Sequence, residues 1–239
     1  MFKRSLRSWL VVPANKSVAI EGAAQAGADA VVIDLVEFVA DKHKSAARAA
    51  VRAAVERVNA TGSKAYVQTT PATHEADLAA AIGQSLKGVV VARAESAAQI
   101  QTIDKYLNTL EKKHGMRDGS VSLVIALETA RGNQDACDIV TASKRVTAIT
   151  LGRADLVMDL RPEPSGELHM MPYLMQRLVM LAGATGVTPL GAWWRAPDRG
   201  LLATPENTLK AAQRGRAMGF KGALCLRADQ VAALNAAYA

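Results

Sequence analysis

The chain has 239 residues, half of them hydrophobic but only 4% aromatic, and its formal net charge is +7. This length suits one complete core, because (β/α)8 barrels often run to about 250 residues, and we expect a single domain over residues 1–239. A core so poor in aromatics must be built from Ala, Val, Leu and Ile. That composition fits strands alternating with Ala-rich helices and is a poor fit to disorder or a coiled coil.

Strand-like and helical patterns alternate along the whole chain. Short apolar runs bounded by Gly, Pro, Asn or Lys predict strands at residues 9–12, 30–35, 65–69, 89–93, 123–127, 147–151, 190–194 and 223–226. Helical patterns lie between them, most clearly at residues 44–58, 97–113, 172–186 and 205–219, and a further helical stretch covers residues 133–143. The alternation favours a (β/α)8 barrel over an open sheet. Neither GxGxxG nor GxxxxGK[ST] follows a strand, which disfavours a dinucleotide or P-loop site.

Two carboxylates follow neighbouring predicted strands. Glu128 comes directly after the apolar run 122–127, and Asp155 comes soon after the run 146–151. The carboxyl ends of parallel strands are where such folds place their chemistry. Two acids there, without Cys or His beside them, favour magnesium or manganese over zinc. The alternative is that both acids cap helices or form ion pairs at helix starts.

The placement of the positive charge indicates which partners to expect. Four arginines lie at or just past the ends of strand-like runs: Arg93, Arg153, Arg195 and Arg227. This favours a barrel mouth that binds small anions, although scattered solvated arginines would give the same count. No block of Lys and Arg is interleaved with stacking aromatics, so we expect no nucleic acid.

The cysteines, histidines and N-terminus suggest no further site. Cys137 and Cys225 have no CxxC or Cys/His spacing, and we expect both to be small buried hydrophobes. The apolar run near the N-terminus stops at Pro13, too short for a signal segment or membrane span. We therefore expect a cytoplasmic protein that does not bind membranes. Four histidines are expected to be solvated and not catalytic: His43, His74, His114 and His169.

Several motifs occur in order over nearly the whole chain. They are Arg7-Ser8…Pro13, Asp34-Leu35…Lys44…Arg48, Glu128-Thr129-Ala130-Arg131-Gly132 and Gly152-x-x-Asp155-Leu156. Together they resemble the family of citrate lyase β-subunits and the related HpcH/HpaI-type 2-oxo-acid aldolases. The resemblance implies an oligomeric (β/α)8 barrel that binds magnesium through Glu128 and Asp155. Such enzymes make or break a carbon–carbon bond next to a carbonyl, often on an acyl-CoA or a 2-oxo acid.

The chain departs from the family pattern at four places. Gln68 stands where the family has an arginine that holds the substrate, and Val36 stands where it has a glutamate. Further along, Gly191 replaces an aspartate, and Arg227-Ala228 replaces a His-Pro pair. Because charge-assisted hydrogen bonds are roughly twice as strong as neutral ones, Gln68 should stabilise a developing anion less well.

The resemblance also concerns the C-terminus. The chain stops at Ala239, shortly after the eighth predicted strand, so we expect the usual C-terminal lid of the family to be missing or shortened. A neighbouring subunit would then cover the mouth, with the adjacent Trp193 and Trp194 as candidate contact residues. We therefore expect a homo-oligomer.

The sequence thus predicts a magnesium-dependent carbon–carbon lyase acting on a small anionic acyl-CoA or 2-oxo acid. Glu128 and Asp155 are the expected metal ligands. Gln68, Arg93 and Glu128 are the expected catalytic residues, and Arg153 joins them in binding substrate. Two alternatives remain open: a 2-oxo-acid aldolase, and a catalytically reduced barrel that binds a ligand or a partner protein.

Overall fold

The computed structural model describes residues 6–152, 156, 159–160, 171–192 and 204–239. Eight parallel strands pair in chain order, and β8 pairs with β1 to close the sheet. They are β1 (Ser8–Pro13), β2 (Ala30–Asp34), β3 (Lys64–Thr69), β4 (Leu86–Val91), β5 (Ser122–Leu127), β6 (Val146–Leu151), β7 (Thr188–Ala192) and β8 (Gly222–Cys225). The predicted (β/α)8 barrel is confirmed.

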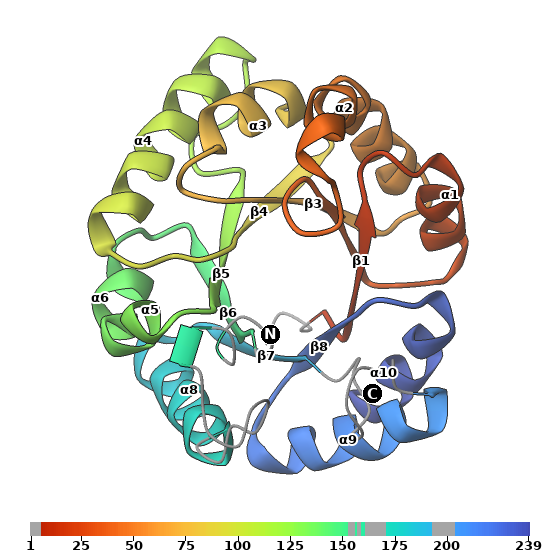
Figure 1. The fold of residues 1–239 in the computed structure, drawn as a ribbon, viewed down its shortest axis with the longest axis vertical. Helices are drawn as coiled ribbons and strands as arrows, with labels where there is room; N and C mark the ends of the chain where they lie inside the picture. The colour runs from red at the N-terminus through yellow and green to blue at the C-terminus, as the bar shows by residue number, and fades with distance from the viewer. Residues whose placement is uncertain (1–5, 153–155, 157–158, 161–170, 193–203) are drawn as a thin grey trace.

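The helices form a ring around the strands (Figure 1). They are α1 (Ser17–Gln25), α2 (Lys44–Ala60), α3 (His74–Ala81), α4 (Ala97–Lys113), α5 (Ala130–Gln134), α6 (Ala136–Thr141), α8 (Met171–Thr185), α9 (Pro205–Met218) and α10 (Val231–Ala237), with 3-10 turns η1 (Asp41–His43) and η2 (Ala228–Gln230). Among the described residues, no helix combines the length and apolar character that crossing a bilayer requires.

Alternation along the strands divides the core into two layers. Side chains of one parity fill the barrel: Trp9, Val11, Ala30, Val32, Tyr66, Val90, Val124, Ala126, Ala148, Leu190 and Leu224. Those of the other parity pack against the helices, in a cluster dominated by Ala, Val, Leu and Ile. Within the barrel the rings of Trp9 and Tyr66 lie 4.5 Å apart, centroid to centroid. The core composition agrees with the prediction.

Local hydrogen bonds explain where the observed helix ends agree with the predicted ones and where they differ. The α4 bounds agree with the predicted range 97–113, because Ser96 and Gln99 form a capping box at its start. Residues 133–143 were expected to be one helix, but two short ones, α5 and α6, occupy this stretch and break at Asp135. The Arg177 guanidinium donates to the carbonyls of Asn133 and Gln134, so these carbonyls at the end of α5 are satisfied outside a longer helix.

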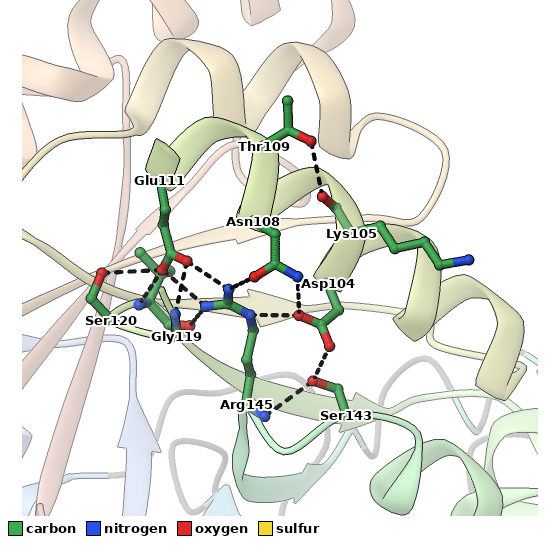
Figure 2. Close-up of polar contacts among 10 residues, drawn as sticks. Asp104, Lys105, Asn108, Thr109, Glu111, Gly119, Ser120, Ser143 and Arg145 are labelled. Atoms are coloured by element: carbon green, nitrogen blue, oxygen red, sulfur yellow. Dashed lines mark hydrogen bonds and ion pairs between the residues drawn. The ribbon is translucent and has the colours of Figure 1, made fainter. Parts of the chain in front are cut away.

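A buried ion-pair cluster ties α4 to the amino end of β6 (Figure 2). The guanidinium of Arg145 lies 2.6 Å from Oε2 of Glu111 and 2.6 Å from Oδ1 of Asp104. It also donates to the side-chain oxygen of Asn108 at 2.5 Å, while Ser143 Oγ donates to Asp104 at 2.8 Å. The Glu111 side chain is fully buried. The cluster lies at the amino end of the barrel, so its contribution is to stability, since the chemistry of such barrels lies at the other end.

Candidate active site

Glu128 lies where the sequence places it, at the carboxyl end of β5. Its parity directs the side chain toward the barrel interior, and the residue is only 9% exposed. Oε2 of Glu128 accepts the backbone N–H of Arg93, at 3.0 Å, from the end of β4. On the β6 side, Gly152 leaves the space that Glu128 fills, since a Cβ atom there would lie 2.4 Å from Glu128 Cγ. The carboxylate is thus fixed between two strand ends.

The residues that follow Glu128 explain why the motif continues as it does. Thr129 caps α5, because its Oγ1 accepts the N–H of Gly132 at 3.0 Å. Gly132 permits a close approach of the loop after β4, as a Cβ atom there would lie 2.3 Å from the Ala94 carbonyl oxygen. The cap and the glycine hold the start of α5 against the loop after β4. They therefore fix the backbone from which Glu128 projects.

Described residues on either side of Asp155 make backbone contacts next to Glu128. Gly152 N–H donates to the Leu127 carbonyl at 3.2 Å, and Leu156 N–H donates to the Gly152 carbonyl at 3.2 Å. Further on, Asp159 Oδ2 accepts the N–H of Ala130, the first residue of α5, at 2.6 Å. Asp155 and Arg153 themselves lie outside the described residues. Within the described ranges, no three His, Cys, Asp or Glu side chains gather as a metal cluster.

Arg93 was expected to end the fourth strand, but β4 ends at Val91. Arg93 follows in the left-handed backbone region, with φ of 54°. Among the described residues, no other non-glycine residue has a positive φ. Its side chain is 56% exposed and reaches Glu37, with Nη2 3.8 Å from Oε1. This sparsely populated conformation turns the N–H to Glu128 while the guanidinium extends to the loop after β2.

Gln68 lies between these two loops. In the sheet, Asp34 of β2 pairs with Gln68 of β3, which pairs with Val90 of β4. Gln68 has the same parity as the barrel-filling Tyr66, so its side chain faces the interior near the carboxyl end, and it is 7% exposed. Gln68, which is expected to stand in place of the family arginine, therefore lies on the floor of the mouth.

Asp34, at the end of β2, holds the loop that carries Glu37. Its Oδ1 accepts the N–H groups of Val36 and Glu37, and its Oδ2 accepts that of Phe38 at 2.7 Å. Burial raises the pKa of the Asp34 carboxyl, and the three N–H groups oppose that rise. Lys44 completes the loop by donating to the carbonyls of Leu35 and Val36, at 2.6 and 2.7 Å.

The Arg48 of the motif holds the next loop in the same way. Arg48 Nε lies 2.7 Å from Oδ1 of Asp77, a side chain that is 1% exposed. Oδ2 of Asp77 accepts the hydroxyls of Thr69 and Thr73, at 2.6 and 2.7 Å. The spacing of Lys44 and Arg48 thus gives two adjacent anchors on α2, one for each of two mouth loops. Arg7, at the amino end, instead forms a bidentate pair with Asp29 at 2.8 Å.

Arg227 forms an exposed ion pair with Asp229, two residues away, and Arg195 lies outside the described residues. Two expectations, for Cys137 and His74, need revision. Cys225 is buried as expected, but Cys137 is exposed, because α6 turns Ala136, Ile139 and Val140 toward the core. His74 is not solvated: it is 7% exposed and stacks edge-on against Tyr106.

The sequence argument missed the parts played by Gly152, Asp77 and Glu37. Gly152 was noted only as part of a motif, although its lack of a side chain is what admits Glu128. Asp77 lies in the first turn of α3 and carries no signal besides a polar residue after the third strand. Glu37 follows the buried Asp34, and the conformation of Arg93 brings the guanidinium to Glu37 across the mouth.

The closed barrel carries a buried carboxylate at the carboxyl ends of its strands, where (β/α)8 enzymes place their active sites. A family model of HpcH/HpaI aldolase/citrate lyase proteins matches residues 7–228. The chain belongs to this family.

Related proteins span most of the chain. Citrate lyase subunit beta of Haemophilus influenzae is 26% identical over 236 residues, which cover 98% of this chain and 79% of that protein. (3S)-malyl-CoA thioesterase of Cereibacter sphaeroides is 27% identical, over 97% of this chain and 76% of that protein. A structure of CitE from Mycobacterium tuberculosis with magnesium and acetoacetate superposes with a TM-score of 0.75 at 25% identity, covering 100% and 92% of the two chains. The same CitE protein has been solved with magnesium and pyruvate, with 26% identity to this chain, a TM-score of 0.73, and coverage of 98% and 92%.

Proposed function

We propose that this protein is a magnesium-dependent carbon–carbon lyase acting on a small anionic 2-oxo acid or acyl-CoA. The observation that carries the proposal is the buried Glu128 carboxylate at the mouth, fixed by the Arg93 N–H and admitted by Gly152. Glu128 and Asp155 would hold the ion. Their oxygen donors suit a hard cation, and the structured segments on either side of Asp155 make contacts next to Glu128.

Other residues of the chain would bind the substrate, supply positive charge and exclude water. When bound, magnesium would act as a Lewis acid toward the oxygen on which negative charge develops as the carbon–carbon bond breaks. Gln68 would donate a hydrogen bond to the substrate from the floor of the mouth. Arg93 and Arg153 would supply positive charge for an anionic substrate. The buried ends of β3 and β5 would exclude water from the reacting atoms.

The relatives support this class of substrate. The CitE structures hold magnesium together with acetoacetate or pyruvate, which are small oxo acids. The malyl-CoA thioesterase acts on a CoA thioester. We propose small oxo acids and CoA thioesters as the first substrates to test on this chain. We also propose that the enzyme is homo-oligomeric and cytoplasmic.

A second candidate is a barrel that binds such a ligand without cleaving it. The uncharged Gln68, where the family has an arginine, favours this alternative. Turnover assays with magnesium on 3-hydroxyacyl-CoA and 4-hydroxy-2-oxo acids separate the two, and they also distinguish an acyl-CoA lyase from a 2-oxo-acid aldolase.

Calorimetry tests the metal site directly. Magnesium should bind the wild type and lose most of its affinity in Glu128→Gln and in Asp155→Ala. The matched control is Glu56→Gln, because Glu56 is an exposed acid in the second half of α2 and makes no contact with the Glu128 region that the proposal uses. Unchanged magnesium affinity in both Glu128→Gln and Asp155→Ala would remove the metal assignment.

A further inference from the structure

The ion pair between Glu37 and Arg93 spans the carboxyl end of β3. Arg93 follows β4 and Glu37 follows β2, whereas β3 lies between these strands in the sheet. The guanidinium must therefore cross the strand end that carries Gln68. The Arg93 guanidinium therefore places a positive charge near Gln68, where the family arginine would have supplied one.

Arg93 also divides the mouth into two ends. Its backbone N–H points to Glu128 after β5, while its guanidinium extends the other way, to Glu37 after β2. A ligand held by magnesium near Glu128 would thus have its far end nearer the guanidinium. The positive φ of Arg93 allows both contacts at once, and such backbone outliers cluster at ligand-binding sites.

The pair is weak enough to be displaced. Its separation is 3.8 Å, longer than a hydrogen bond, and its side chains are 56% and 29% exposed. Exposed pairs of this kind contribute little, because water and salt screen the charges. A ligand carboxylate with a planar, bidentate approach to the guanidinium would bind it more tightly.

We propose that Glu37 is an internal competitor for Arg93, and that the site selects substrates with a second carboxylate. One carboxylate and the adjacent oxo group lie at the magnesium end, beside Glu128. The second carboxylate displaces Glu37 and takes bidentate hydrogen bonds from Arg93. This inference rests on the proposed function, because it assumes that magnesium holds the first end of the ligand.

Ligand binding tests the proposal without any need for turnover. The two probes are oxaloacetate, which has a second carboxylate, and pyruvate, which lacks it, each titrated with magnesium present. Arg93→Gln should weaken oxaloacetate binding roughly tenfold or more, the value of a charge-assisted contact. Glu37→Gln should tighten it by about two- to fivefold, the range set by an exposed ion pair. Pyruvate affinity should change much less than oxaloacetate affinity in both variants, because pyruvate has no second carboxylate.

Controls separate competition from general effects. Glu21 and Arg57 form a comparable exposed pair away from the mouth, at 3.6 Å, so Glu21→Gln should change neither affinity. Magnesium affinity should survive in Arg93→Gln, because the contact with Glu128 uses the backbone N–H. The double variant Glu37→Gln/Arg93→Gln should match Arg93→Gln alone, since Glu37 then has nothing to compete for.

The outcomes also separate this inference from the function on which it rests. If neither acid binds the wild type in a magnesium-dependent way, the proposed function is wrong and the competition with it. If both acids bind but Glu37→Gln leaves oxaloacetate affinity unchanged or weaker, only the competition is overturned. An equal effect of Arg93→Gln on pyruvate and oxaloacetate would also overturn it.

Discussion

The side chain of Glu128 occupies the space that Gly152 leaves open. A Cβ atom on residue 152 would lie 2.4 Å from Cγ of Glu128, closer than real Cβ contacts come, and a tight 3.0 Å from its Oε1. Gly152 does not have a positive φ, so the reason for glycine here is room and not backbone conformation. The two residues connect the ends of β5 and β6 at the mouth of the barrel.

Gly152→Ala should therefore displace Glu128 and lower magnesium affinity by tenfold or more. Overpacking of this kind should also cost about 1–3 kcal/mol of stability. Calorimetry measures the first effect and urea unfolding the second. Gly83→Ala is the control, because a Cβ atom there meets nothing within 4 Å. Full metal affinity in Gly152→Ala would show that the carboxylate position does not matter for binding.

Gln68→Arg should raise turnover of a family substrate by an order of magnitude or more. The added guanidinium would lie on the floor of the mouth, and a charge-assisted contact is worth about 1.5–3 kcal/mol. Arg93→Lys should reduce turnover although the charge is kept, because lysine lacks the planar fork. Steady-state kinetics on the purified variants checks both. No response from either would mean that these positions do not govern substrate handling.

Much of the fold was predictable because its signals are local. Strand and helix periods alternate eight times, and a capping box such as that of Ser96 and Gln99 marks a boundary within a few residues of sequence. The break at Asp135 was not predictable, because it depends on Arg177, which comes from another helix. Cys137 was misplaced for the same reason: its exposure follows from how α6 packs.

The site was predictable in part for a similar reason. Glu128 could be located because a strand end precedes it. The contact between Glu37 and Arg93 depends on a left-handed backbone at Arg93, a residue type that gives no sequence signal for that conformation. The buried state of His74 depends on Tyr106, which lies in the next helix of the ring.

We expect the protein to self-associate, as the apolar Trp193 and Trp194 after the seventh strand suggest. Light scattering coupled to size exclusion should give a multiple of the 25.3 kDa chain mass at micromolar concentration. Adding magnesium tests whether the assembly depends on the site. A monomer mass under these conditions would contradict the expectation.

The Glu111–Arg145 pair should make the fold sensitive to acid. Burial alone would raise the pKa of Glu111, but hydrogen bonds from Arg145 and from the N–H groups of Val121 and Gly119 outweigh it and lower the pKa to about 2. Because the folded pKa is below the ordinary value of 4.5, this stabilisation is complete above pH 4.5 and is lost as pH falls toward 2. We estimate the loss at about 1–3 kcal/mol.

Urea unfolding between pH 7 and pH 3 measures this effect as a difference between variants. Glu111→Gln should be less stable than the wild type at pH 7, since Arg145 loses its fully buried partner, and the gap should narrow as the pH falls. Glu206→Gln is the control, because Glu206 is 75% exposed in its pair with Lys210 and should change neither stability nor slope. A gap between wild type and Glu111→Gln that stays constant down to pH 3 would show that Glu111 does not take up a proton in this range on unfolding.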